Sequence, residues 1–152
     1  MLGQPEVGVG IVPAGGAIER LPELVGTARA LEIIASSDDY DAPTAERYGW
    51  INRAIPDGEL DDYVDTLARR LASFDAAALA AAKRLVLTRR HSASVGDYRE
   101  TLDALRGLIV SPSTGARRAA VAAHAVTVGQ DFELSMGHHL GVIDATTEGA
   151  SA

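Results

Sequence analysis

The sequence predicts a helix-rich α/β fold, in which a short extended segment and loop come first and a series of helices follows. Two observations predict this order. Glycine and proline interrupt residues 1–16 too often for a helix, whereas apolar residues recur at helical spacing through most of the later chain. Because strands and helices do not alternate, the chain is not a complete doubly wound domain.

Short helical segments follow the opening loop. Pro22 is expected to interrupt the first of them, and Gly26 separates it from the second, although apolar residues keep helical spacing across that break. The polar stretch SSDDYDAP predicts a turn before the third, which Gly49 closes as a C-cap. The predicted helical segments are 18–25, 27–36 and 42–48.

The middle of the chain holds the clearest helix. Before it, WINRAIP alternates enough to predict a short strand over 50–56, and a Pro-Asp-Gly turn ends that strand. Residues 59–74 then carry one apolar stripe, with acidic residues in the first turns and Arg69 and Arg70 in the last, as the helix dipole favours. The stripe consists of Leu60, Tyr63, Val64, Leu67, Leu71 and Phe74.

Helices also fill the rest of the chain. Asp75 is placed to cap an alanine-rich helix that ends near His91, a second helix spans 94–110, and Pro112 opens a third that ends near 128. A final amphipathic segment, DFELSMGHHLGVI, precedes the polar tail 144–152, which is expected to fray.

Composition bounds the kind of protein. A chain of 152 residues with 47% apolar and 23% charged residues has globular composition and is long enough for one domain. A net charge of −7 makes nucleic acid or an anionic membrane a poor partner, and the absence of cysteine excludes disulfides and thiolate metal sites. No signal peptide or membrane span is recognisable, so a cytoplasmic location is expected.

Local motifs leave the site open. GVGIVPAGG superficially resembles a phosphate loop, but Pro13 occupies the third glycine position of G-x-G-x-x-G and the Walker A lysine is missing. Glu6 lies between Pro5 and small apolar residues, where partial desolvation would suit it to proton transfer; an exposed loop glutamate is the alternative. His138 and His139 lack further ligands at metal spacing, so we predict a solvated helix end and no metal.

A long ordered run of residues resembles the enoyl-CoA hydratase/isomerase, or crotonase, family. LGQPEVGVGIVPAGGAIERLPELVGTARALEII is similar to the family phrase of Q-P-E, G-I-x-P, a glycine-rich turn and Q-R-L-P-R-L-V-G. APTAERYGWINRAIP and a later A-x-x-x-A-K, which ends at Lys83, continue the match to about residue 110. The resemblance implies a spiral of ββα units with a helical trimerisation region, of which this chain resembles the C-terminal half.

The resemblance assigns roles to residues of the opening loop. Glu6 matches the Q-P-E glutamate that acts as general acid/base in hydratases, and Pro5, Gly10, Ala14 and Gly16 match positions around the substrate. Ala14 replaces a glycine whose N–H holds the reacting water; alanine keeps that N–H but adds a methyl group beside it. Lys83 and Arg84 could approach the CoA phosphates, or form a solvated basic helix end.

The same resemblance indicates what this chain lacks. The oxyanion hole, the first glutamate of hydratases and most of the CoA-binding surface belong to the preceding half of the family fold. We therefore expect a partial crotonase-like domain over 1–143, divided into a core remnant (1–56) and a helical region (57–143), that is inactive and poorly soluble alone. Its substrate would be an acyl-CoA thioester, with coenzyme A as part of the substrate and no separate cofactor. The alternative is a non-catalytic remnant or assembly module that forms homo-oligomers or joins a full-length crotonase subunit.

Overall fold

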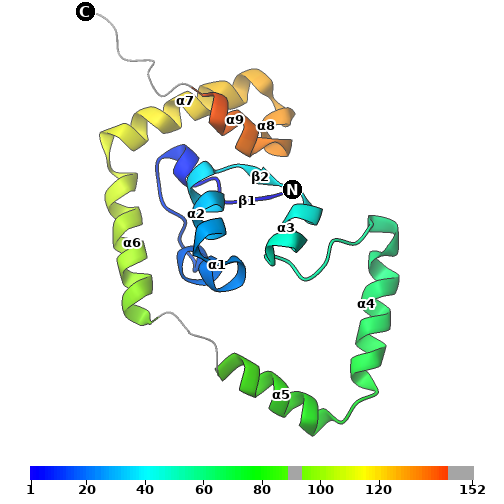
Figure 1. Ribbon diagram of the computed structural model, residues 1–152. Helices are drawn as coiled ribbons and strands as arrows, with labels where there is room; N and C mark the ends of the chain where they lie inside the picture. Colours follow the sequence, from blue (N-terminus) through cyan, green and yellow to red (C-terminus); the bar gives the residue numbers. More distant parts are fainter. Residues whose placement is uncertain (89–93, 144–152) are drawn as a thin grey trace, which may run out of the picture. The chain divides into compact units, whose positions relative to one another are not determined.

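The computed structural model describes residues 1–88 and 94–143, which form two compact units (Figure 1). The first unit contains residues 1–52 and the described residues from 94 onward, and the second contains residues 53–88. The elements of the first unit are β1 (Leu2–Gly3), η1 (Val7–Val9), α1 (Ala17–Val25), α2 (Thr27–Ser36), β2 (Asp39–Tyr40), α3 (Ala42–Tyr48), α6 (Val95–Ile109), α7 (Pro112–Val128), α8 (Gln130–Leu134) and α9 (Met136–Val142). The second unit contains α4 (Asp57–Ala72) and α5 (Ala76–Thr88). The predicted helix-rich α/β class is confirmed.

Two very short strands bring the opening segment beside the stretch that follows α2. β1 pairs antiparallel with β2, and Leu2 lies opposite Tyr40 (Figure 1). The turn predicted over SSDDYDAP therefore contains a strand. Pairing of this length contributes little by itself, so the surrounding helices must hold the two segments together.

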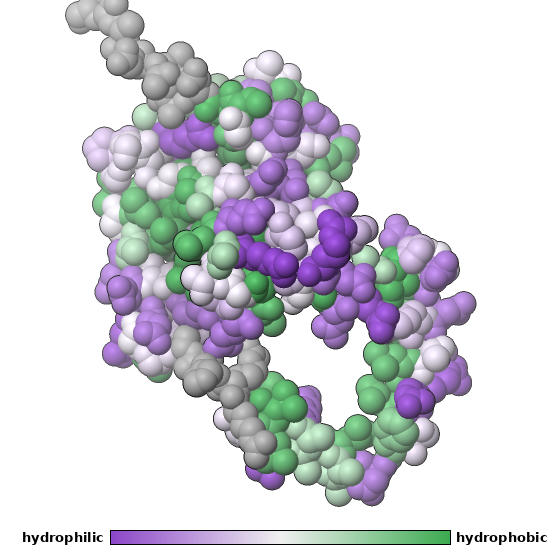
Figure 2. Space-filling view, viewed as in Figure 1, coloured by the Kyte–Doolittle hydropathy of each residue, from purple (hydrophilic) through white to green (hydrophobic). Residues whose placement is uncertain are grey.

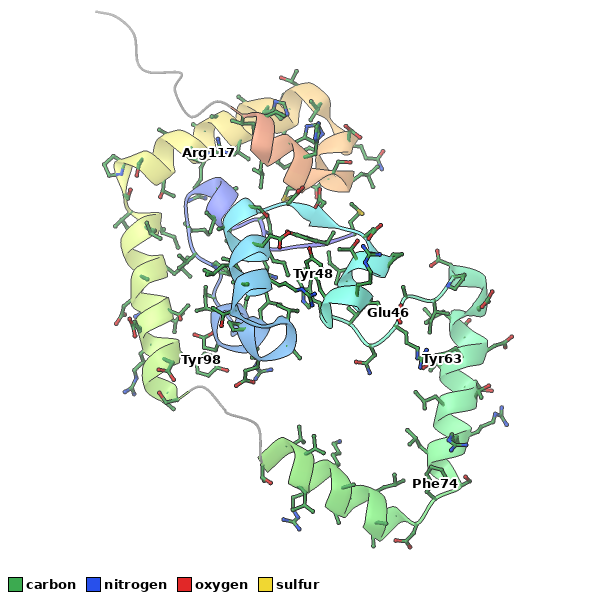
Figure 3. All side chains as sticks on the ribbon, in the orientation of Figure 1. Glu46, Tyr48, Tyr63, Phe74, Tyr98 and Arg117 are labelled. Carbon is green, nitrogen blue, oxygen red and sulfur yellow. The ribbon has the colours of Figure 1, made fainter. Side chains whose placement is uncertain are left out.

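The core of the first unit lies between α1, α2 and β2. Ile33 is completely buried, and the other buried members of this cluster are Leu21, Val25, Ala30 and Tyr40. Figure 3 shows Tyr48 at the edge of this cluster, where its ring centroid lies 5.9 Å from that of Tyr40. Pro22 does not interrupt α1 as predicted. Burial of residues on both sides of it outweighs the single hydrogen bond that proline removes from the helix.

Capping residues set where the helices begin. Asp41 caps α3, and the predicted C-cap, Gly49, has a φ of 81°. Ser94 and Asp97 form a capping box at the start of α6, and Ser111 caps α7 directly before its first residue, Pro112. α6, α7 and α9 contact elements of residues 1–52, and α8 packs on α7 and α9, so the C-terminal helices belong to the same unit as the opening loop.

The second unit consists of two amphipathic helices. Arg69 lies 2.7 Å from Asp65 one turn away, and Asp75 accepts a hydrogen bond from the N–H of Ala78, which confirms the predicted cap of α5. The predicted apolar stripe of α4 is exposed, at fractions between 38% for Tyr63 and 53% for Val64. Figure 2 shows apolar side chains at the surface of α4 and α5.

The predicted strand over 50–56 is wrong. The N–H of Trp50 and that of Ile51 both point back to the carbonyl of Ala45, so they close the end of α3 and are not available to a strand ladder. The predicted fraying of residues 144–152 and the predicted helix end near His91 lie outside the described residues. Of the helices that the structure describes, none has the length and apolar character needed to cross a membrane.

Candidate active site

Glu6 begins a tight turn directly after the first strand. Its backbone has φ −60° and ψ −42°, and its carbonyl accepts hydrogen bonds from the N–H groups of Val9 (3.1 Å) and Ile11 (3.0 Å). Pro5 directly precedes this turn, and Gly10 ends it with a φ of 88°. A left-handed φ favours glycine, which explains why this predicted site position carries no side chain.

The Glu6 side chain is half-buried, and its Oε2 is inaccessible to solvent without a hydrogen-bond partner among the described residues. Burying a carboxylate oxygen in this way is costly unless a ligand or water provides the missing hydrogen bond. A carboxyl group at such a position can give a proton to, or take one from, a group that enters the site. The alternative of an exposed loop glutamate does not fit this burial.

The turn after Glu6 leaves no space for a side chain at Gly8. A Cβ there would lie 2.8 Å from the Cδ1 of Leu140 and 3.1 Å from the Cβ of Ser37. The Gly8 N–H donates to the Ser37 hydroxyl at 2.7 Å, and Ser37 is buried with a left-handed φ of 54°. The turn therefore rests directly on the end of α2 and on α9.

Two side chains of α7 bind the same turn from the other side. Thr114 is buried and donates its hydroxyl hydrogen to the carbonyl of Gly10 at 2.8 Å. Arg117 donates from Nε to the carbonyl of Gly8 at 2.5 Å, and Figure 3 shows it on α7. Sequence reasoning missed both residues, because they lie beyond the recognisable motifs and nothing local links them to a loop more than a hundred residues earlier.

The loop from Pro13 to Gly16 leads from this turn into α1. Pro13 and Gly16 are buried and Ala14 is half-buried, while Gly16 takes the left-handed conformation, with a φ of 105°. Added as a Cβ, a side chain at Gly16 would lie 3.4 Å from both Arg20 and Tyr98. A hydrogen bond with Tyr98 is the main cause that raises the pKa of Arg20. This predicted site segment is thus packed between α1 and α6.

A second carboxylate with a buried oxygen lies at the start of α1. Glu19 accepts a hydrogen bond from the hydroxyl of Thr101 at 2.6 Å through Oε1, while its Oε2 is buried without a partner among the described residues. The structure shows that Glu19 joins α1 to α6.

The five predicted site residues thus lie on one continuous loop between β1 and α1. The structure places the backbone of this loop, and the roles of Glu6, Pro5, Gly10, Ala14 and Gly16 remain predictions. Lys83 and Arg84 are exposed on α5 in the second unit, and their proposed contact with phosphates also remains a prediction.

An apolar groove of about 470 Å³ lies beside the turn. Val9 and Ile11 line it from the opening loop, and α6 and α7 provide the opposite side together with one cationic side chain, Arg118. The remaining lining residues are Ile109, Val121 and Ala122.

The histidines of the C-terminal helices correct one prediction. His138 is exposed as predicted for a solvated helix end, but His139 is buried, with 7% of its surface exposed. Its ring nitrogens lie 3.0 Å from His124 Nε2 and 3.0 Å from Asp131 Oδ2, and its ring stacks on Phe132. His124 and His139 therefore form a ring pair. Among the described residues, no group of three or more His, Cys, Asp or Glu side chains is arranged to hold a metal ion.

Comparison with known proteins identifies relatives of this chain. The family model for enoyl-CoA hydratase/isomerase matches residues 1–105. A crotonyl-CoA hydratase of Syntrophomonas wolfei is 41% identical over 71 residues, which cover 47% of this chain and 27% of that protein. A short-chain-enoyl-CoA hydratase of Clostridioides difficile is 41% identical over 70 residues, covering 46% of this chain and 45% of the relative.

Solved structures extend the likeness to the C-terminal helices. A crystal structure from Streptomyces avermitilis, assigned to the enoyl-CoA hydratases, superposes with a TM-score of 0.83 at 38% identity. The superposition covers 94% of this chain and 51% of the other, so this chain spans about half the length of that relative. The expected partial crotonase-like architecture is confirmed by this coverage. This chain belongs to the enoyl-CoA hydratase/isomerase family.

Proposed function

We propose that this chain supplies the acid/base glutamate, Glu6, to a site that hydrates or isomerises a 2-enoyl-CoA thioester. The observation that carries this proposal is the buried Oε2 of Glu6, which has no hydrogen-bond partner among the described residues. The family match and the names of the relatives supply the substrate class. Coenzyme A enters as part of the substrate, and the proposed reaction needs no separate cofactor. The proposed location is the cytoplasm.

In hydration, the proposed role of Glu6 is to exchange a proton with the water that adds across the double bond. As the water oxygen attacks the β-carbon, negative charge moves to the thioester oxygen and must be stabilised there. The resemblance assigns that task to backbone N–H groups of the half of the family fold that this chain does not span. Each such donor contributes about two to three orders of magnitude in rate.

We therefore propose that the 152-residue chain is inactive alone and becomes active when the complementary half is present. The test is a chimera that joins the part of the Streptomyces avermitilis protein preceding the matched half to residues 1–152 of this chain. The chimera is expected to hydrate crotonyl-CoA, whereas the isolated chain is expected to show no turnover.

The role of Glu6 is tested within the same chimera. Glu6→Gln removes the proton-transfer group and is expected to lower kcat by about two orders of magnitude or more. Glu100→Gln makes the same chemical change at an exposed position of α6 and should leave turnover unchanged. An active chimera whose turnover survives Glu6→Gln would contradict the proposal.

The exposed apolar stripe of α4 favours a second candidate, a non-catalytic assembly module. Five apolar side chains, Leu60, Tyr63, Val64, Leu67 and Leu71, remain exposed along one face of this helix, which is typical of a surface that another subunit covers. The resemblance implies trimers, so the partner would be a further copy or another crotonase-family subunit. A chimera that assembles but never turns over substrate would support this second candidate.

A further inference from the structure

The backbone turn that begins at Glu6 is fastened by α7 at two carbonyl groups. The hydroxyl of Thr114 binds the Gly10 carbonyl and the guanidinium of Arg117 binds the Gly8 carbonyl. The two partners of α7 are separated from these glycines by 104 and 109 positions in the sequence. Contacts so distant in sequence form only when the C-terminal helices have packed on the opening loop.

Arg117 links this turn to the end of the described chain. One terminal nitrogen donates to the carbonyl of Ile143 at 2.6 Å and the other donates to the carbonyl of Leu140 at 2.7 Å. These three hydrogen bonds of Arg117 all go to backbone carbonyls, which a planar guanidinium can reach at once because its donors form a rigid fork. The three donors of a lysine sit on one nitrogen, so they cannot replace the three separate guanidinium nitrogens that bind these carbonyls.

The two carbonyl groups that α7 binds belong to the same short turn as Glu6. Gly8 follows Glu6 by two positions, and the Glu6 carbonyl accepts from Val9 and Ile11, on either side of Gly10. Movement of Gly8 or Gly10 would therefore carry the Glu6 backbone with it. Catalysis is sensitive to such movement, because a displacement of about 1 Å can cost about a hundredfold in rate.

We infer that Thr114 and Arg117 are positioning residues for Glu6, and that α7 holds the acid/base carboxylate in place without contacting substrate. This inference rests on the proposed function for the role of Glu6. The holding of the turn can be measured separately from activity, so failure of one claim is distinguishable from failure of the other.

The first test measures hydrogen exchange in the full 152-residue chain. Thr114→Val and Arg117→Met each remove a fastening hydrogen bond and are expected to accelerate exchange of the Val9 and Ile11 amides at least tenfold. Amides of α4, in the other unit, serve as the internal reference. Arg106→Met is the matched control, because Arg106 binds only exposed Asp103 on α6 among the described residues. Unchanged exchange at Val9 and Ile11 in both variants would overturn the inference.

The second test uses the chimera and asks whether Thr114 and Arg117 act through Glu6. Each substitution is expected to lower kcat about tenfold while KM stays within about twofold, and Arg117→Lys should recover part of the loss. In a Glu6→Gln background, Thr114→Val should cause no further loss, because the group that it positions is already gone. A purely structural role would multiply the two losses, and that result would overturn the inference.

The outcomes separate the two claims. If the unmodified chimera shows no turnover, the proposed function fails, while the exchange measurement still decides whether α7 holds the turn. If the chimera is active and depends on Glu6 but neither α7 variant changes kcat, the inference fails and the proposed function stands.

Discussion

The carboxylate of Asp39 accepts a hydrogen bond from the backbone N–H of Gly137 at 2.7 Å, across 98 positions of sequence. Asp39 belongs to β2 and Gly137 lies in the first turn of α9, where the backbone N–H groups lack partners within the helix. The side chain of Ser135, at the N-cap position of this helix, makes no capping hydrogen bond. Asp39 of β2 therefore caps α9 in place of a local side chain. This hydrogen bond holds α9 against the strand that pairs with the opening segment.

Gly137→Ala is expected to destabilise the chain, because the contact at Asp39 leaves no space for a methyl group. A Cβ at position 137 would collide with the backbone N of Asp39 and lie 2.6 Å from the carbonyl carbon of Asp38. Backbone atoms cannot move aside as a flexible side chain can, so we expect a loss of about 1–3 kcal/mol in the free energy of unfolding. Urea denaturation followed by circular dichroism measures it.

Gly141→Ala is the matched control on the same helix. No atom lies within 4 Å of a Cβ built at that position, so alanine should raise stability by about 0.5–1 kcal/mol through its higher helix propensity. Equal effects of the two substitutions would contradict the packing of α9 on β2.

Truncation of the two adjacent histidines should change the free energy of unfolding to very different extents. His139→Ala removes a buried ring that stacks on Phe132 and leaves His124 without its partner, which should cost roughly 2 kcal/mol or more. His138→Ala changes an exposed side chain and should stay within about 0.5 kcal/mol of the unmodified chain. Thermal unfolding of the two variants side by side tests whether the burial of His139 is correct.

Asp41 should make stability depend on acid pH. Hydrogen bonds from the Thr44 hydroxyl, and then from the Thr44 backbone N–H, lower the pKa of this N-cap carboxyl. A group whose pKa is lowered by folding stabilises the folded state above its unfolded pKa of about 3.9 and loses that effect as the pH falls through the lower folded value.

Removing the charge of Asp41 should therefore make the stability of the fold depend less on pH in the acid range. Asp41→Asn keeps a capping side chain but cannot titrate, so its unfolding midpoints at pH 6 and pH 2.5 should differ less than those of the unmodified chain. Glu100→Gln, at an exposed position of the same unit, serves as the control. A steeper acid dependence in Asp41→Asn would show that the cap does not act through its charge.

The exposed stripe of α4 should support association if the proposed assembly is correct. Leu67→Arg places a charge in the middle of the stripe and is expected to shift the chain toward smaller species in sedimentation velocity. Thr66→Arg adds the same charge one residue earlier, about 100° around the helix, and should leave the distribution unchanged. A unit that remains monomeric at all concentrations before any substitution would rule out the assembly.

The family could be identified from the sequence because its evidence is local. The order of Q-P-E, a glycine-rich turn and R-L-P-E-L-V-G requires no knowledge of contacts. Several helix limits were predictable for the same reason: the cap Asp75, the C-cap Gly49 and the helix-opening Pro112 act within one turn of their own position.

The predictions that failed depended on partners distant in sequence. Residues 50–56 alternate as a strand does, but their first N–H groups complete the end of α3. His139 lies next to another histidine in an amphipathic segment and was predicted to be solvated, yet folding brings His124 and Phe132 against it. Alternation and polarity describe a segment by itself, whereas burial is decided by what packs on it.

By itself, the sequence determined the family, the limits of several helices and Glu6 as the candidate acid/base residue. Only the tertiary structure decided how the turn at Glu6 is held. Gly8 and Gly10 could be recognised as part of a glycine-rich loop, but their hydrogen bonds to Arg117 and Thr114 span more than a hundred residues. Such a contact leaves no periodicity or spacing to recognise, because it forms between a backbone carbonyl, which every residue carries, and a side chain that ordinary helices also present to solvent.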